Sequence, residues 1–179
     1  MTVAGIILAA GNGARMRTKK PKPLHVVAGL SLLAHTVQIM RVGGIEAIGV
    51  VVSQELADNS SLKGLLADDI EILVQSEQRG TADALKSARS VFAAADTIVV
   101  APVDMILVTG EFVRRMIALH RESTALSTIL ASEVDDASGL GRVKLDDLGQ
   151  PVSVTEENDA DKRLLQSNLV NTAWYCFDN

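Results

Sequence analysis

Apolar and polar positions alternate in blocks along the first two thirds of the chain. Residues 3–8 form an apolar run that leads into glycine, which predicts a buried strand followed by a loop. Over residues 31–40 the apolar positions recur at helical spacing until Gly43 and Gly44 end the pattern, so a helix is expected there. The same reading predicts strands over 48–52, 70–74 and 97–104, and helices over 54–67, from Thr81 to about residue 95, and over 112–120.

The pattern changes beyond Ser123, where strands follow one another without long helices between them. These strands are expected within residues 124–134, 141–147, 151–157 and 168–177. The chain therefore predicts an α/β core with a β-rich C-terminal layer. No internal repeat, low-complexity tract or flexible linker interrupts it, so a single domain is expected over residues 1–179.

Composition supports this class and narrows the partners. Aromatic residues make up only 3% of the 179 residues, so the core must consist of Val, Ile, Leu and Ala, which suits buried parallel strands. Six basic residues and no acidic residue stand before Glu46, although the net charge is −5. An acidic protein with one basic segment would repel a long polyanion, which argues against nucleic acid and favours a small anion.

Two further features bear on location. Cys176 is the only cysteine, so no disulfide can form within the chain, and a buried apolar role in a reducing cytoplasm is expected. The apolar run at residues 3–10 is too short to span a membrane and has no preceding positive region. We therefore predict a cytoplasmic protein with no targeting signal and no membrane partner.

The basic segment is the loop that follows the first strand, with the sequence LAAGNGARMRTKKPKPLH over residues 8–25. Gly11 and Gly13 allow backbone amides to approach an anion, and lysines and arginines nearby can neutralise its charge. This favours a polyphosphate ligand over a solvated turn. The loop fits neither the Walker motif nor the G-x-G-x-x-G dinucleotide fingerprint, which disfavours an oxidoreductase.

The same loop resembles the signature LAAGxGTRM…PKxLH of nucleoside-diphosphate-sugar pyrophosphorylases, and its LH ending is most similar to the uridyltransferase domain of bacterial N-acetylglucosamine-1-phosphate uridyltransferases. Five further segments resemble that family in the same order. They are QSEQRGTADAL, VDMIL, GLGR, VTEENDA and NTA, which start at Gln75, Val103, Gly139, Val154 and Asn171. Ala173 stands where the family has glycine, and Val103 stands where it has glycine before the metal-binding aspartate.

The resemblance implies a nucleotidyltransferase with a Rossmann-like, mostly parallel sheet and helices on both faces. Its site residues carry over by position in four groups. The nucleotide would contact Leu8, Ala9, Ala10, Gly11, Gly13, Gln75, Gly80 and Thr81. The triphosphate would contact the catalytic residues Arg15 and Lys22. Mg²⁺ would bind Asp104, and the amino sugar would contact Gly141, Glu156 and Asn171.

The implied reaction transfers UMP from UTP to a sugar 1-phosphate, with N-acetylglucosamine 1-phosphate as the first choice, and releases pyrophosphate. Positioning and charge neutralisation would supply the catalysis, without a covalent enzyme intermediate. The resemblance also implies that the domain continues beyond Asn179, where the family supplies a second metal ligand, and that this chain lacks the acetyltransferase domain. The oligomeric state is left open by the sequence.

Each residue also has a plainer interpretation that the sequence leaves open. Lys22 could be a solvated lysine, Asp104 could cap the following helix, and Glu156 with Glu157 could be an exposed turn pair. The chain could use another nucleoside triphosphate or acceptor, or it could be a regulatory module that binds a nucleotide without turnover.

Overall fold

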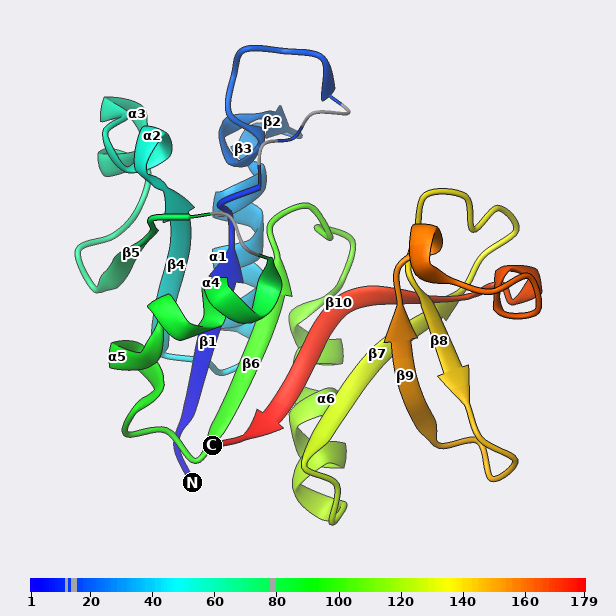
Figure 1. Cartoon of the computed structure of the whole chain (residues 1–179). Coiled ribbons are helices and arrows are strands. Elements are labelled where there is room, and N and C mark those ends of the chain that lie inside the picture. Colours follow the sequence, from blue (N-terminus) through cyan, green and yellow to red (C-terminus); the bar gives the residue numbers. More distant parts are fainter. Residues whose placement is uncertain (12, 14–15, 78–79) are drawn as a thin grey trace. The chain divides into compact units, whose positions relative to one another are not determined.

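The chain folds into two compact units in the computed structural model, which describes residues 1–11, 13, 16–77 and 80–179, the side chain of residue 63 excepted. The first unit comprises Met1–Thr128 together with Tyr175–Asn179, and the second comprises Ile129–Trp174 (Figure 1). A single domain over the whole chain stays a prediction.

The first unit is built on a mostly parallel sheet. Strands β1 (Val3–Leu8), β4 (Ala47–Ser53), β5 (Ile70–Gln75) and β6 (Thr97–Pro102) lie in the order β5-β4-β1-β6, and each neighbouring pair is parallel. The last residues of β10 (Leu169–Asp178) run antiparallel to β6. This confirms the predicted α/β class and all four predicted strands of the core.

Helices cover both faces of this sheet (Figure 1). Helices α1 (Leu32–Val42) and α6 (Gly110–Glu122) pack against each other on one face, while α4 (Thr81–Ser87) and α5 (Arg89–Phe92) cover the other. Two glycines allow this close packing. A Cβ on Gly5 would lie 2.6 Å from Sδ of Met40 in α1, and a Cβ on Gly49 would lie 2.8 Å from Cγ2 of Val91 in α5.

Side-chain caps define where the two long helices begin. Ser31 Oγ accepts a hydrogen bond from the backbone N–H of Ala34 at 3.0 Å, and Thr109 Oγ1 accepts one from Phe112 at 3.2 Å. A pair of two-residue strands, β2 (Val26–Val27) and β3 (Leu30–Ser31), precedes α1. Because α6 begins at Gly110 with Thr109 as its cap, the alternative that Asp104 caps this helix is wrong.

Two of the predicted helices are shorter than the apolar spacing suggested. Residues 54–67 contain α2 (Gln54–Ala57) and α3 (Ser60–Lys63) instead of one helix. Asn59 starts the second of these, because its side-chain oxygen accepts a hydrogen bond from the Ser61 N–H at 3.0 Å and so competes with helix continuation. The helix predicted from Thr81 is likewise divided at Ala88, between α4 and α5.

The second unit is a small β structure. Strand β8 (Arg142–Leu145) is antiparallel to β9 (Pro151–Thr155) and to the first half of β10. Strand β7 (Ser127–Glu133) also pairs with β10. Two short 3-10 helices, Glu157–Asp159 and Leu164–Gln166, lie between β9 and β10. The four strands predicted after Ser123 are therefore confirmed.

Two buried side chains tie the C-terminal residues to the first unit. Cys176 is fully buried, and burial raises the pKa of its thiol to about 12, so the predicted apolar role is confirmed. His120 on α6 is also buried, with Nδ1 2.9 Å from Thr128 Oγ1 and Nε2 3.1 Å from Asp178 Oδ1.

Among the described helices, none has the length and apolar character needed to cross a membrane.

Candidate functional site

The loop after β1 lies at the carboxyl end of the parallel sheet. Ala9 continues beside β4, since its N–H donates to the carbonyl of Val51 at 2.8 Å, and both Ala9 and Ala10 are buried. Gly11 follows with open space where a Cβ would be, so its backbone can be approached by a ligand. Leu8, the last residue of β1, is half-buried and packs against the apolar core.

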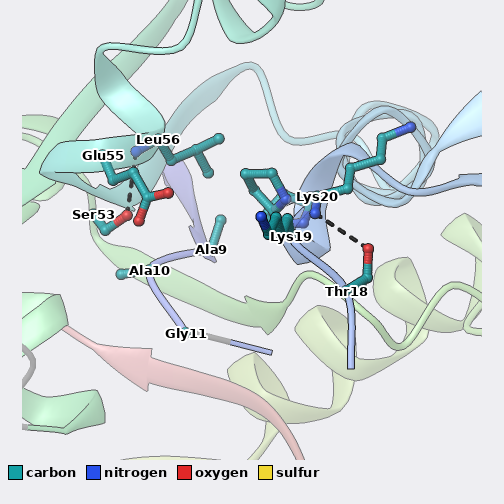
Figure 2. A pocket seen from close by; sticks show the side chains of 11 residues that line it. Ala9, Ala10, Gly11, Thr18, Lys19, Lys20, Ser53, Glu55 and Leu56 are labelled. Atoms are coloured by element: carbon teal, nitrogen blue, oxygen red, sulfur yellow. Dashed lines mark hydrogen bonds between the residues drawn. The ribbon is translucent and has the colours of Figure 1, made fainter. Parts of the chain in front are cut away.

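A cavity of about 400 Å³ opens beside this loop, a size that suits a small-molecule ligand. Figure 2 shows the residues at the end of β4 and in α2 on one side of this space, the lysine-rich segment on the other, and the loop after β1 between them. The lining residues are Ala9, Ala10, Gly11, Thr18, Lys19, Lys20, Pro21, Pro23, Ser53, Glu55 and Leu56.

Sequence reasoning missed Ser53, Glu55 and Leu56 as members of this wall. No motif marks them, but their position after β4 could have indicated them, because the carboxyl ends of adjacent parallel strands lie together. Ser53 is occupied as the cap of α2, with Oγ accepting from the Leu56 N–H at 3.3 Å. Glu55 is exposed and places a carboxylate on the side of the cavity opposite Lys19 and Lys20 (Figure 2).

Lys22 and Asp104 form an ion pair beside the loop, although 82 positions separate them in the sequence. Lys22 Nζ donates to Asp104 Oδ2, and the two side chains are 26% and 44% exposed. The parallel register of β1 and β6, in which Leu8 pairs with Pro102, brings the turn that carries Asp104 next to the loop. Asp104 was predicted as the last residue of this strand, but β6 ends at Pro102, so Asp104 lies two residues beyond the observed strand end.

The backbone around Lys22 is held by its neighbours. Lys22 begins a 3-10 helix, Lys22–Leu24, directly after Pro21. Gly13 has φ 59°, and a Cβ there would lie 3.0 Å from Cβ of Lys22, so glycine leaves room for the lysine to pass. Arg15, the other predicted catalytic residue, lies outside the described residues. Lys22 is thus only partly exposed and paired with a carboxylate, unlike a fully solvated lysine.

Gln75, Gly80 and Thr81 lie together at the start of α4. Gln75 is buried at the end of β5, and its amide nitrogen donates to the Gly80 carbonyl at 3.3 Å and to Asp83 Oδ2 at 3.0 Å. Gly80 has φ 101° and immediately precedes Thr81, the first residue of the helix. Gln75 therefore anchors this turn, and the three residues are not among those that line the cavity.

The three residues predicted to contact a sugar meet within the second unit. The backbone N–H of Asn171 donates to the Gly141 carbonyl at 2.9 Å, and a Cβ on Gly141 would lie 3.5 Å from Glu156 Oε1. Glu156 is exposed, whereas its neighbour Glu157 is only half-exposed, with Oε1 3.9 Å from Arg142 Nη2. The two glutamates are therefore in different environments rather than a uniform exposed pair.

Ala173 occupies a left-handed backbone conformation next to this group, with φ 61°. The Ala173 N–H donates to Asn171 Oδ1 at 3.0 Å, so this irregularity within β10 also orients the asparagine side chain. We expect Ala173→Gly to raise the free energy of unfolding by about 0.5–1 kcal/mol, because glycine takes this φ without the strain that a Cβ causes.

Urea denaturation of the wild type and of Ala173→Gly would measure this difference in the free energy of unfolding. Ala160→Gly is the matched control, since Ala160 has φ −78° and glycine there only adds entropy to the unfolded chain. Destabilisation of similar size in both variants would contradict the expected strain at Ala173.

Asp104 is the residue best placed to bind a divalent cation. In the part of the chain that the structure describes, no group of three or more His, Cys, Asp and Glu side chains is arranged to hold a metal. Asp104 Oδ2 accepts a hydrogen bond from the Lys22 ammonium, and the Asp104 side chain is 44% exposed, so its carboxylate is also open to solvent. A hard cation such as Mg²⁺ fits this donor when phosphate oxygens and water complete its coordination, as in many nucleotide-binding enzymes.

The fold and this loop are those expected of the nucleotidyltransferase family. Residues 5–166 match the family model of the MobA-like NTP transferase domain, and the chain belongs to that family. A crystal structure of a protein assigned as a glucose-1-phosphate thymidylyltransferase, from Bacillus anthracis in complex with a sucrose, shares the fold. Its TM-score is 0.78 at 22% identity, over 99% of this chain and 72% of that one.

The chain is similar to the bifunctional protein GlmU of several bacteria. It is 34% identical to GlmU of Clostridioides difficile (strain 630) over 178 residues and 36% identical to GlmU of Alkaliphilus oremlandii (strain OhILAs) over 178 residues. Each match covers 99% of this chain but only 38% of the relative, so the chain spans well under half the length of these proteins.

Proposed function

We propose that this chain transfers UMP from UTP to a sugar 1-phosphate, N-acetylglucosamine 1-phosphate in the first instance, and releases pyrophosphate in the cytoplasm. The observation that carries this proposal is the Lys22–Asp104 contact beside the glycine loop, which joins the lysine proposed to bind phosphate to the carboxylate proposed to bind the metal. The family membership supports the reaction class, and the similarity to GlmU supports the choice of UTP and amino sugar.

The nucleotide half of this proposal rests on the first unit. The cavity beside Ala9, Ala10 and Gly11 would hold the ribose end of the nucleoside, with the base extending out of it toward Gly80 and Thr81 and the phosphates directed to Lys22. Gln75 would act by fixing Gly80 and Thr81 for contact with the base, since its amide nitrogen is already bonded. Glu55, which was not predicted, can accept hydrogen bonds from ribose hydroxyls or from a base N–H. Gly13 would serve by admitting Lys22, and Arg15 would add charge to the triphosphate.

The sugar half rests on the second unit. Glu156 and Asn171 would accept and donate hydrogen bonds to the hydroxyl and amide groups of the sugar, beside the small Gly141. A neutral sugar is recognised by such directional hydrogen bonds rather than by charge. In this proposal each unit would carry the contacts for one substrate.

In the proposed reaction, a phosphate oxygen of the sugar 1-phosphate attacks the α-phosphorus of UTP. The new P–O bond forms as the bond from the α-phosphorus to the bridging oxygen breaks, and pyrophosphate leaves with the electron pair. Lys22 neutralises the negative charge that develops on the phosphate oxygens, and the loop backbone holds them in line. Mg²⁺, bound by Asp104 and the phosphates, would add Lewis-acid stabilisation of the same charge.

Release of pyrophosphate from each of the four common nucleoside triphosphates, with Mg²⁺ and either N-acetylglucosamine 1-phosphate or glucose 1-phosphate, tests this proposal. We expect turnover with UTP and the amino sugar. Turnover with another triphosphate would assign a different nucleotide to the same loop. Binding of UTP without pyrophosphate release, under every combination, would mean that the chain is a nucleotide-binding module rather than an enzyme.

A further inference from the structure

Arg142 is a buried arginine in the second unit. Among the described Asp, Glu, Lys and Arg residues it is the only one that is buried, with 3% of its surface exposed. Burying a guanidinium is costly unless its donors are satisfied and its charge is balanced. Its surroundings should therefore explain why this position needs an arginine.

The guanidinium contacts three segments of the chain. Nε donates to the carbonyl of Ser167 at 2.9 Å, Nη1 donates to the carbonyl of Leu140, and Nη2 lies 3.9 Å from Glu157 Oε1. Only the planar fork of arginine offers donors in several directions at once, and a lysine could satisfy these partners only in part.

Each of these three segments carries one of the residues proposed to contact the sugar. Leu140 directly precedes Gly141, and Glu157 directly follows Glu156. Ser167 ends the turn that leads into β10, which carries Asn171. The Asn171 N–H also donates to the Gly141 carbonyl, and a Cβ on Gly141 would lie 3.5 Å from Glu156 Oε1, so these three positions are neighbours. One guanidinium thus contacts the backbone of two of these segments and the Glu157 side chain of the third.

We propose that Arg142 is a positioning residue for the sugar 1-phosphate: it contacts no substrate itself but fixes the geometry of Gly141, Glu156 and Asn171. This inference rests on the proposed function. It adds to the proposed sugar site a residue that acts without contacting the substrate. Because small displacements of binding groups weaken oriented contacts strongly, loss of the guanidinium should weaken sugar binding selectively.

The test compares Arg142→Met, Arg142→Lys and Glu157→Gln with the wild type. The affinity for N-acetylglucosamine 1-phosphate and for UTP is measured separately by calorimetry, together with the two KM values for pyrophosphate release. We expect Arg142→Met to weaken sugar-phosphate binding about tenfold, Arg142→Lys about threefold and Glu157→Gln about threefold, with UTP affinity unchanged within about twofold.

Glu157→Gln keeps the two carbonyl contacts of Arg142 and is therefore informative even if Arg142→Met fails to fold. Glu133→Gln is the matched control, because Glu133 is exposed on β7 of the same unit, and it should leave both affinities unchanged. A folded Arg142→Lys or Glu157→Gln protein that loses thermal stability but keeps its sugar-phosphate affinity would overturn the inference. Equal loss of affinity for both substrates would overturn it as well.

Failure of the proposed function gives a different result. In that case the wild type itself would bind no sugar phosphate, whatever its affinity for UTP. If the wild type binds the sugar phosphate and the variants bind it equally well, only the role of Arg142 is lost.

Discussion

Lys22→Ala is expected to lower kcat/KM for pyrophosphate release by about 100- to 1000-fold, the usual cost of removing one preorganised donor to developing charge. The Lys22 ammonium lies beside the glycine loop and already contacts the carboxylate of Asp104. Its removal would leave the phosphate oxygens without this counter-charge and leave Asp104 without its cation. The effect should appear mainly in kcat, because the charge that Lys22 neutralises grows as the transition state forms.

Lys86→Ala is the matched control for this variant. Lys86 is an exposed lysine in α4, so the control removes the same charge from the same unit away from the loop. Steady-state assays with UTP and the sugar 1-phosphate provide the measurement. Wild-type activity in Lys22→Ala, with intact folding by circular dichroism, would rule out the catalytic role and return Lys22 to an ordinary surface ion pair.

Asp104→Asn is expected to lower kcat/KM by about 100-fold or more at low Mg²⁺, since metal-ion stabilisation of phosphoryl charge is worth several kcal/mol. The amide has nearly the same shape as the carboxylate but lacks its charge, and a hard cation binds it more weakly. High Mg²⁺ should restore part of the activity, because phosphate oxygens remain available as ligands.

Binding of Mn²⁺ in the presence of UTP, followed by electron paramagnetic resonance, measures the metal separately from turnover. Asp68→Asn is the control, because Asp68 is exposed in the turn that precedes β5. We also expect Lys22→Ala and Asp104→Asn to combine non-additively, since each removes the partner of the other. Unchanged Mn²⁺ affinity in Asp104→Asn would show that the metal is held elsewhere.

The site combines one continuous loop with residues from other parts of the chain, and this explains why sequence analysis located some of its residues and missed others. The loop from Leu8 to Lys22 is continuous in the sequence, and its glycines, prolines and lysines carry a recognisable pattern. Ser53, Glu55 and Leu56 complete the cavity from another strand end and belong to no motif. The strand end at Asp104 was misplaced by two residues, because an apolar run does not show where hydrogen bonding in the sheet stops.

The sequence by itself determined the α/β class, the order of the elements and the glycine-rich, basic make-up of the first loop, on which the phosphate-binding proposal rests. These depend on local periodicity, on glycine conformations and on a run of basic residues, all of which are written within short windows. It did not determine the breaks at Asn59 and Ala88, where local hydrogen bonding or packing prevails over apolar spacing.

Only the tertiary structure decided which distant groups meet. The pairing of Lys22 with Asp104 follows from the parallel register of β1 and β6, and the contacts of Arg142 with Glu157 and Ser167 follow from the return of the chain through β9 and β10. Such contacts join positions far apart in the sequence, up to the 82 positions between Lys22 and Asp104, and depend on strand order and burial, which no single segment specifies. The physical reason is that charge pairing and guanidinium burial are properties of the assembled fold, whereas helix and strand patterns are properties of the chain.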